Sequence, residues 1–510
     1  MNLTKVIFSL FRSRLKTIEK SYAQAADVQQ IQLKYLVHTA RTTEWGTKYD
    51  FDKIHNYSDF SAKVPLQTYE EVKPYVTRML DGEKNLIWPT KIEWFAKSSG
   101  TTNDKSKFIP VSKEALRDCH YRGAKDCLNF YAQMNPESQL FSGKSLILGG
   151  SHKISTRINN TFVGDLSAIL IHNNPFYTNL IRTPHRSVAL MDEWEAKLEK
   201  IVETTINQDV RSLSGVPSWM LVMIKRILEK TGKTNLNEVW PNLEVFFHGG
   251  VSFRPYRDQY QALIHSANMH YVENYNASEG FFATQNSLDD SSMLLMIDYG
   301  IFYEFIPFNE YETESPNVIP LWEVEIGKNY AVVISTNSGL WRYKLGDTVM
   351  FTAANPYKIK VTGRTQHHIN AFGEELMIDN AEKGLLMACT QTGAVVKEYT
   401  AAPVFMSANN KGKHQWVIEF EKMPKSMEVF IQLLDQSLQA VNSDYEAKRY
   451  KDITLLCLEV TVSRKNLFHD WLKSKGKLGG QHKVPRLSNS REYIDELLTL
   501  NIDGATRIDK

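Results

Sequence analysis

The stretch Lys97–Pro110, which reads KSSGTTNDKSKFIP, decides the fold of this chain. Positions 98–102 hold four hydroxyl side chains and one glycine, with strand-like runs on either side, IEWFA at 92–96 and KFIPV at 107–111. A small hydroxyl-rich loop between two strands leaves backbone N–H groups unpaired and sets O–H donors beside them. Such a loop suits the oxygens of a phosphate group. We expect a phosphate-binding loop here, and the alternative is an ordinary polar turn.

The residues of this expected phosphate loop are Ser98, Ser99, Gly100, Thr101 and Thr102, with Lys105 and Lys107 supplying positive charge nearby. The stretch is not a Walker A motif, because the spacing G-x4-G-K-[ST] is missing.

Composition limits the classes of partner. The chain has 510 residues, with 42% hydrophobic and 23% charged, as in globular proteins, and 60 Lys and Arg nearly balance 58 Asp and Glu. This balance argues against nucleic acid or an anionic membrane as the main partner. Four cysteines without a C-x-x-C pair make no disulfide framework. We therefore expect a reducing, cytoplasmic location.

The first twenty residues, MNLTKVIFSLFRSRLKTIEK, place their apolar side chains at helical spacing. The longest apolar run, at 6–11, is short for a signal peptide and lacks a small-residue cleavage site after it. Elsewhere no stretch approaches the ~20 apolar residues of a spanning helix. We predict an amphipathic helix packed on the body of the protein and no membrane span.

Three apolar runs that end in glycine or polar residues indicate buried parallel strands. They are Lys144–Gly150 (KSLILGG), Leu243–Phe247 (LEVFF, followed by HGGVS) and Met269–Glu273 (MHYVE, followed by NYNASEG). Helical spacing appears before and between the last two, at Glu193–Asn207, Trp219–Thr231 and Arg257–His265. This alternation predicts an α/β fold whose ligands lie past the carboxyl ends of the strands.

From Gly300 onward the pattern changes. Three strand-like runs with short turns, at 300–308, 330–336 and 349–352, predict an antiparallel part of the sheet. Beyond about residue 363 a strand–helix alternation and a basic C-terminal segment follow. We predict two domains: a large N-terminal α/β domain, 1–363, with sheets flanked by helices, and a smaller C-terminal α+β domain, 364–510.

Two polar clusters adjoin predicted strands. In YNASE at 275–279, the ring of Tyr275 can stack on a purine, Ser278 can donate to a phosphate oxygen, and Glu279 can hold Mg²⁺ through one carboxylate. The alternative is a helix N-cap at Ser278. In WRYKLGD at 341–347, which we expect to end a strand, Asp347 can accept hydrogen bonds from a ribose diol. The alternative is a hairpin turn.

A late glycine-rich loop, GKLGGQHKVPR at 476–486, carries several cations. A lysine on such a loop can bring positive charge to a reacting phosphate after a domain closes. The alternative is a solvated basic loop.

These clusters occur together and in a fixed order. SSGTT, GGVSF, YNASEG, YKLGD, GR and the late lysine resemble the adenylate-forming superfamily of acyl-CoA synthetases, luciferases and adenylation domains. Within it, SSGTT-x5-FIP, FFHGGVSFRPY, NYNASEGFFA and GGQHKVPR are similar to the Gretchen Hagen 3 family of auxin-responsive acyl acid amido synthetases. The resemblance runs from about residue 65 to 485, and it implies the adenylate-forming fold with a mobile C-terminal domain.

The resemblance also implies roles for the matching residues. The family's phosphate loop is matched by Ser98, Ser99, Gly100, Thr101, Thr102 and Lys107, and its turn along the adenine by Gly249 and Gly250. Tyr275 matches the aromatic position beside the purine, Ser278 matches a phosphate contact, and Glu279 matches the Mg²⁺-linked acid. Asp347 matches the ribose-binding aspartate, Arg364 matches the arginine near the hinge, and Lys483 matches the lysine that meets the reacting carboxylate and α-phosphate.

Two residues depart from the family pattern. Many relatives have glycine at the position of Asp104, and acyl-CoA synthetases usually have aspartate at that of Gln366. We also consider whether Arg122 meets a substrate carboxylate.

The implied reaction uses ATP, with Mg²⁺, to convert a small carboxylic acid into an acyl-adenylate and pyrophosphate. A small amine or amino acid then displaces AMP to give an amide. Two alternatives stay open: transfer to a thiol of CoA or a carrier protein, and a nucleotide-binding module without turnover. For assembly we expect a monomer or a weak homo-oligomer.

Overall fold

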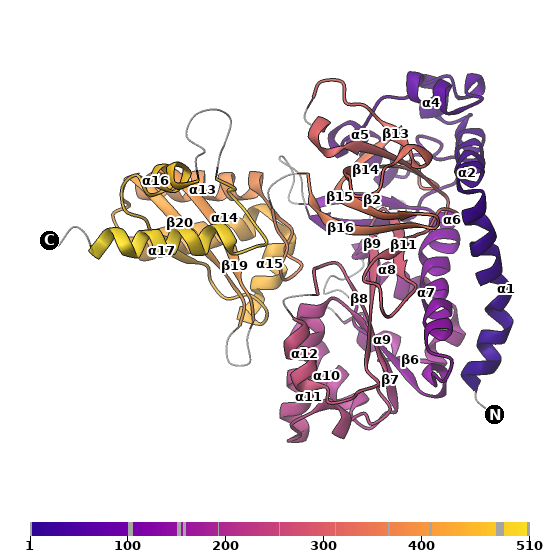
Figure 1. The fold of residues 1–510 in the computed structure, drawn as a ribbon, viewed down its shortest axis with the longest axis horizontal. Helices are drawn as coiled ribbons and strands as arrows, with labels where there is room; N and C mark the ends of the chain where they lie inside the picture. The colour runs from indigo at the N-terminus through magenta and orange to yellow at the C-terminus, as the bar shows by residue number, and fades with distance from the viewer. Residues whose placement is uncertain are drawn as a thin grey trace.

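The computed structural model describes residues 3–99, 106–149, 155–156, 160–191, 193–253, 256–311, 313–365, 368–406, 411–475 and 484–506. The predicted amphipathic N-terminal helix is α1 (Leu3–Ala23), and it continues into α2 (Ala25–Ala40) along one side of the main body (Figure 1). Short helices α3 (Glu44–Lys48) and α4 (Tyr57–Lys63) lead to α5 (Tyr69–Leu80). The sequence predicts a helix from Tyr69 to Leu80 with Thr68 as its N-cap, and α5 has these bounds. Thr68 and Glu71 close a capping box at its start.

In the described part of the chain, twelve strands form one sheet, in the order β13-β12-β14-β15-β16-β11-β10-β9-β8-β7-β3-β6. Their bounds are β3 (Lys144–Ile147), β6 (Arg182–Thr183), β7 (Val210–Gly215), β8 (Val245–Gly249), β9 (His270–Ala277), β10 (Gly280–Gln285), β11 (Met293–Leu295), β12 (Ile301–Pro307), β13 (Ile319–Pro320), β14 (Asn329–Thr336), β15 (Tyr343–Ala354) and β16 (Tyr357–Arg364).

The sheet joins a parallel half to an antiparallel half. Strands β6, β3, β7, β8 and β9 pair in parallel, as predicted for the buried runs. From β9 to β13 every pairing is antiparallel. The predicted antiparallel sub-sheet is therefore continuous with the parallel strands, and the predicted α/β fold class is confirmed.

The expected phosphate loop belongs to a second, smaller sheet. Its strands, in the order β2-β1-β5-β4, are β2 (Ser106–Val111), β1 (Trp94–Ser99), β5 (Phe162–Gly164) and β4 (Ser155–Thr156). Strands β1 and β2 form an antiparallel pair in which Ser98 faces Lys107. The predicted strand–loop–strand arrangement is thus present, with residues 100–105 of the loop lying outside the described residues.

Helices flank the strands of both sheets. These are α7 (Tyr121–Met134), α8 (Leu166–Asn173), α9 (Arg186–Ala189), α10 (Trp194–Thr205), α11 (Pro217–Thr231) and α12 (Arg257–Leu263). The start and end of α11 follow from its sequence: Pro217 stands in the first turn, and Gly232 ends the helix in the left-handed conformation. Its buried face shares a core with strands β3, β7 and β8.

Ser112 and the helical spacing of the apolar residues after it predict a helix that runs to about Met134. This helix is present, but it is not uniform. Ser112 caps α6 (Lys113–Ala115), and one π-helical turn, Leu116–His120, separates α6 from α7. Within this turn the Sγ atom of Cys119 accepts a hydrogen bond from the backbone of Phe281 on β10, at 3.2 Å. The buried residues Leu116, Cys119, Gly123 and Cys127 keep spacings of three and four across this turn, so the sequence pattern predicts one continuous helix.

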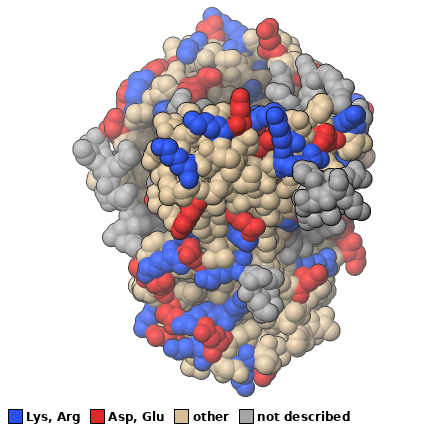
Figure 2. All heavy atoms as spheres, turned by 90° about the vertical axis from the view of Figure 1, so that its left-hand side faces the viewer, with Lys and Arg blue, Asp and Glu red and all other residues tan. Residues whose placement is uncertain are grey.

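After β16 the chain forms a smaller lobe, which lies beside the main body on the left of Figure 1. A strand pair, β17 (His368–Ile369) with β18 (Leu376–Met377), opens it. The rest consists of α13 (Ile378–Thr392), β19 (Val395–Val404), β20 (Lys413–Lys422), α14 (Met427–Val441), α15 (Ser443–Arg449), β21 (Glu459–Val462), α16 (Leu467–Ser474) and α17 (Glu492–Thr506). Basic and acidic side chains are interspersed on its outer face (Figure 2).

The C-terminal lobe docks on α11 and α12 of the main body. The Ser218 hydroxyl donates to the carbonyl of Phe372 at 3.1 Å, and the Tyr256 hydroxyl donates to that of Ala371. The Lys448 ammonium lies 4.6 Å from the centre of the Trp219 ring. Residues 371 and 372, near the start of the lobe, are therefore held against the helices that follow the carboxyl ends of β7 and β8.

One local prediction was wrong, and one alternative is excluded. Asp347 does not end a strand: it lies inside β15, where residues 345–347 oppose the single residue Val332 of β14 and Gly346 has φ +91°. A bulge of this kind admits a Gly-Asp pair without a chain reversal. Ser278 does not cap a helix, because Ser278 and Glu279 form the tight turn between β9 and β10. Helices of the described chain include none whose length and apolarity would let it cross a membrane.

Candidate active site

Three predicted nucleotide-binding residues meet in one buried contact. The hydroxyl of Tyr275, on β9, donates to Oδ2 of Asp347, on β15, at 2.7 Å. Arg364, paired with Asp347 across β15 and β16, places its Nε 3.0 Å from Oδ1. In a flat sheet, β9 and β15 would lie four strand spacings apart, or roughly 19 Å. The large sheet must therefore curl strongly to bring Tyr275 to Asp347.

Burial raises the pKa of Asp347 above its ordinary value, while the Arg364 cation and the Tyr275 hydroxyl oppose that shift. Burial also raises the pKa of Tyr275, and the nearby Asp347 charge adds to the effect, so the phenol stays protonated and acts as the donor. An ionised carboxylate offers about four acceptor positions. Two of those on Asp347 are used by Tyr275 and Arg364, which leaves capacity for ribose hydroxyls.

Arg364 also joins this contact to the C-terminal lobe. Its Nη2 donates to Oε1 of Glu375 at 3.0 Å. Glu375 itself has a left-handed backbone, φ +39°, and its carbonyl accepts from the side chain of Asn442 at 3.0 Å. Sequence reasoning missed Glu375; the acidic pair in FGEEL, eleven residues after Arg364, was the available signal.

Glu279 occupies the turn between β9 and β10 and is half-buried. Burial raises its pKa to about 7; the Lys107 cation opposes the shift, and the Asp347 and Glu375 carboxylates reinforce it. These electrostatic influences place Glu279 between the base of the phosphate loop and the ribose-side carboxylate. A carboxylate with this pKa is poised to exchange a proton for a cation near neutral pH.

The base of the phosphate loop is ordered by β1 and β2. Ser98 faces Lys107 and Ser99 faces Ser106 across the pair. The backbone N–H of Phe108 donates to the Tyr69 hydroxyl at 2.9 Å, and the Lys107 ammonium lies 5.9 Å from the centre of that ring. Gly100, Thr101 and Thr102 lie outside the described residues, so their role as phosphate ligands stays a prediction.

Gly249 and Gly250 end β8 beside the same site. A Cβ on Gly249 would lie 2.4 Å from the carbonyl oxygen of Asn274, so only glycine fits this close approach of β8 and β9. Gly250 has φ +82°, and its carbonyl accepts from the side chain of Asn370 at 3.2 Å. The turn therefore presents bare backbone at the carboxyl edge, next to the C-terminal lobe.

Some of the residues with predicted roles lie among the described residues, and others do not. Ser278 is half-buried in the turn that carries Glu279. Lys483 and its loop, 476–483, lie outside the described residues, so its role in catalysis stays a prediction. No group of three or more His, Cys, Asp or Glu side chains suited to a metal occurs among the described residues. The single carboxylate of Glu279 is enough for a metal such as Mg²⁺, because this ion takes most of its ligands from waters and substrate phosphates.

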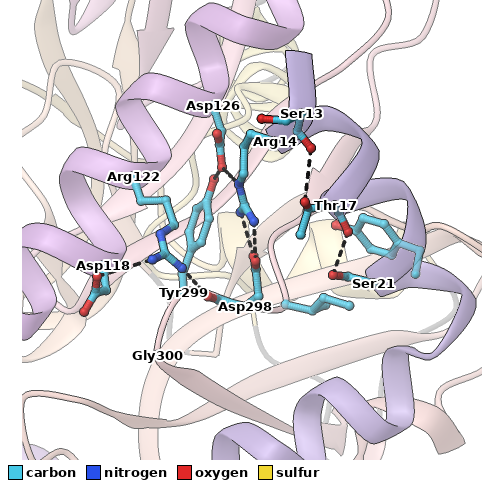
Figure 3. A network of polar contacts seen from close by, with 12 residues as sticks. Ser13, Arg14, Thr17, Ser21, Asp118, Arg122, Asp126, Asp298, Tyr299 and Gly300 are labelled. Atoms are coloured by element: carbon cyan, nitrogen blue, oxygen red, sulfur yellow. Dashed lines mark hydrogen bonds and ion pairs between the residues drawn. The ribbon is translucent and has the colours of Figure 1, made fainter. Parts of the chain in front are cut away.

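Arg122, considered as a contact for a substrate carboxylate, already has protein partners (Figure 3). Its guanidinium donates to Oδ1 of Asp118 at 3.3 Å and to the carbonyl of Asp298 at 3.2 Å. Beside it, Arg14 of α1 donates to Asp126 at 2.9 Å and to Asp298 at 2.6 Å. This network fastens α1 to α7 and the large sheet, which is a structural role.

Comparisons with known proteins cover nearly the whole chain. Three family models match: the GH3 family N-terminal domain at residues 14–269, the central domain at 294–364 and the C-terminal domain at 379–492. The chain is 22% identical to indole-3-acetic acid-amido synthetase GH3.3 of Arabidopsis thaliana over 92% of this chain and 91% of that one. It is 23% identical to jasmonoyl–L-amino acid synthetase GH3.5 of Oryza sativa subsp. japonica, over 94% and 95%.

Solved structures confirm the fold. One is AtGH3.15 acyl acid amido synthetase in complex with 2,4-DB, with a TM-score of 0.62 and 20% identity over 97% of this chain and 96% of that one. Another is 2-hydroxyisobutyryl-CoA ligase in complex with 2-HIB-AMP and CoA, with a TM-score of 0.54 and 12% identity over 94% and 92%.

Proposed function

This chain belongs to the GH3 family, and from that premise we propose that it is an ATP-dependent acyl acid amido synthetase. Relatives along nearly its whole length are named amido synthetases and amino acid synthetases. The observation that carries the proposal is the clustering of Tyr275, Asp347 and Arg364 beside Glu279 and Lys107. Together these residues supply an aromatic face, a diol acceptor, a cation and a poised carboxylate.

In the first half-reaction, a carboxylate oxygen of the acid attacks the α-phosphorus of ATP. The bond from that phosphorus to the bridging oxygen breaks, and pyrophosphate leaves with the electron pair. Asp347 would hold the ribose hydroxyls, Tyr275 would flank the adenine and the turn at Gly249 would line it. The loop hydroxyls and Lys107 would stabilise negative charge on the phosphate oxygens.

A divalent cation fits this proposal as a ligand of Glu279. The bound ion would supply charge neutralisation on the phosphates, as Mg²⁺ does in related chemistry. Lys483 would bring a further cation to the reacting carboxylate and α-phosphate from the C-terminal domain. We retain the predicted boundary, 1–363 and 364–510, as part of the same proposal, and Arg364 then stands at the junction.

In the second half-reaction, the amine of an amino acid attacks the acyl carbonyl. The bond from that carbon to the phosphate oxygen breaks, AMP leaves, and the amine loses a proton to give the amide. A thioester product is the alternative, because the same adenylation site serves a thiol acceptor and the CoA ligase above shares the fold. Intracellular location, inferred from four free cysteines, belongs to the proposal as well.

The test is pyrophosphate release from ATP across a panel of small carboxylic acids, each with an amino-acid mixture, with CoA, and with neither. We expect release with one class of acid, a faster rate with amino acids, and an amide by mass spectrometry. A thioester instead of an amide would select the alternative. If labelled pyrophosphate exchanges into ATP with none of the acids while ATP binds by calorimetry, the chain is a binding module and the proposal is wrong.

A further inference from the structure

One arginine in the parallel half of the sheet is buried without a counter-charge. Arg182, on β6, is 5% exposed, and its Nη2 donates to the side-chain oxygen of Asn179 at 2.9 Å. Its Nε and Nη1 atoms are buried and have no hydrogen-bond partner in the part of the chain that the structure describes. No carboxylate pairs with it among the residues described. A buried guanidinium with two unsatisfied nitrogens carries a large desolvation penalty, which an anionic ligand would offset.

A second arginine adds to the positive charge. Arg186, half-buried on α9, donates from Nη2 to Nδ1 of His172 on α8 at 2.8 Å. Burial and the Arg186 cation lower the pKa of both Arg182 and His172. His172 is therefore neutral with its proton on Nε2, where it is a donor. Two cations and one donor thus converge with no acid paired to either arginine in the described chain.

His172 and Arg186 lie by the carboxyl end of β3, whereas Arg182 pairs with Ser145, two residues before that end. A Cβ on Gly149, just past β3, would lie 2.8 Å from the Ile171 side chain on α8 and 3.6 Å from the Ala189 carbonyl on α9. His172 follows Ile171 directly in the sequence, and Arg186 precedes Ala189 by three residues. The buried Lys197 ammonium also donates to the Gly149 carbonyl, at 3.3 Å.

This end of β3 shares an edge with the proposed nucleotide site. Strand register sets Ile147 level with Ser214 and Phe247 across β7 and β8. Gly149 is thus level with Gly249, two strand spacings away, or roughly 10 Å. His172 also lies 4.9 Å from the ring of Trp94, the first residue of β1, at the end of that strand opposite the phosphate loop. The cluster therefore adjoins the same sheet edge as the nucleotide site and shares no residue with it.

We propose that Arg182, Arg186 and His172 bind the carboxylate of the amino-acid acceptor. This rests on the proposed function, and the chemistry excludes the other anions of that reaction: the acid's carboxylate is consumed at the α-phosphorus, and the phosphates of ATP belong to the hydroxyl loop. Arginine forks match the planar carboxylate group. The site selects amino acids over neutral amines by holding this carboxylate near the acyl carbonyl.

The test compares acceptors that differ only in this group. L-aspartate, L-glutamate and L-leucine are each assayed against their α-amides with the native protein, Arg182→Met and Arg186→Met. Losing a charged hydrogen bond should raise the apparent KM for the amino acid about tenfold or more. The KM for the α-amide should stay as in the native protein. Arg226→Met is the control, since Arg226 on α11 pairs with Glu199 and Glu229.

A binding measurement separates failure of this inference from failure of the proposed function. The amino acid should raise the thermal midpoint of the native protein and not that of Arg182→Met. Without ligand, Arg182→Met should melt no lower than the native protein, because it removes an unpaired buried charge. A KM rise shared equally by amino acid and amide, or an equal midpoint rise in the variant, overturns the inference. Absence of any pyrophosphate exchange in the native protein would sink the proposed function alone.

Discussion

The hydroxyl of Tyr275 donates a 2.7 Å hydrogen bond to Oδ2 of Asp347, although the two residues stand on strands β9 and β15 at distant places in the sheet order. This bond fixes the carboxylate that we assign to the ribose. It also leaves the Tyr275 ring as the aromatic face for the purine. In the proposed site, Tyr275 would contribute twice to the same nucleotide, through its ring and through the acid that it orients.

Tyr275→Phe keeps the ring and removes the hydroxyl. We expect ATP affinity to fall about five- to tenfold, since a hydrogen bond to a charged group contributes roughly 1.5–3 kcal/mol and part of that loss is recovered by water. Isothermal calorimetry measures the effect. Tyr445→Phe is the matched control, because its hydroxyl donates to Asp435 at 2.7 Å in the C-terminal lobe. Equal ATP affinities for Tyr275→Phe and the native protein would contradict the orienting role.

Arg364 holds Asp347 through Nε and Glu375 through Nη2, so its fork couples the ribose carboxylate to the C-terminal lobe. A lysine cannot reproduce this geometry. We expect Arg364→Lys to slow pyrophosphate exchange about tenfold or more, because misplacement of reacting groups is costly.

A double-mutant cycle with Glu375→Gln should give a coupling energy of roughly 1–3 kcal/mol between the two residues. Arg449→Lys is the control, since Arg449 makes a comparable fork to Asp435 within the C-terminal lobe and bonds to neither Asp347 nor Glu375 in the described part of the chain. Strictly additive effects of Arg364→Lys and Glu375→Gln on the exchange rate would refute the coupling.

Local patterns allowed part of this structure to be predicted. The capping box at Thr68 and Glu71 fixed the start of α5, and apolar runs ending in glycine located β3 and β8. Each of these features depends on neighbours within a few positions. The β1–β2 pair around the phosphate loop could be predicted for the same reason.

Long-range features could not be predicted in this way. The curl of the sheet that brings Tyr275 to Asp347 depends on pairings among five strands. Asp347 was expected at a strand end because Gly-Asp usually marks a turn, whereas the bulge in β15 keeps it inside the strand. Glu375 and Arg182 are singled out by the burial of their side chains and by the partners that they contact. Neither property can be predicted from the neighbouring residues in the sequence.

Lys483 can be tested directly, because its proposed role separates binding from chemistry. Lys483→Ala should slow adenylation by about 10²–10³-fold, as for other groups that stabilise transition-state charge. ATP affinity should change little, since the lysine acts on the reacting groups. Quenched-flow measurement of pyrophosphate release checks the first expectation and calorimetry the second. Lys477→Ala, on the same glycine-rich loop, is the control, and native turnover in Lys483→Ala would refute the role.

Glu279 predicts a pH dependence with a definite sign. Its pKa is raised from 4.5 to about 7 in the folded protein, so the folded state keeps a proton that the unfolded state loses. Its contribution to stability is therefore complete below about pH 4.5 and is lost as pH rises toward 7. The thermal midpoint of the ligand-free protein should fall across this range, and Glu279→Gln should remove that part of the fall.

The same carboxylate must lose its proton to hold a metal. Binding of Mg²⁺ with ATP should release a proton at pH 6 and none at pH 8, and the affinity for Mg²⁺ should rise with pH until about 7. Calorimetry in buffers of different ionisation enthalpy measures the release. Glu273→Gln is the matched control, because burial also raises the pKa of Glu273, which lies on β9 before the turn that carries Glu279 and outside the proposed metal site. Proton release that persists in Glu279→Gln would assign the metal to another group.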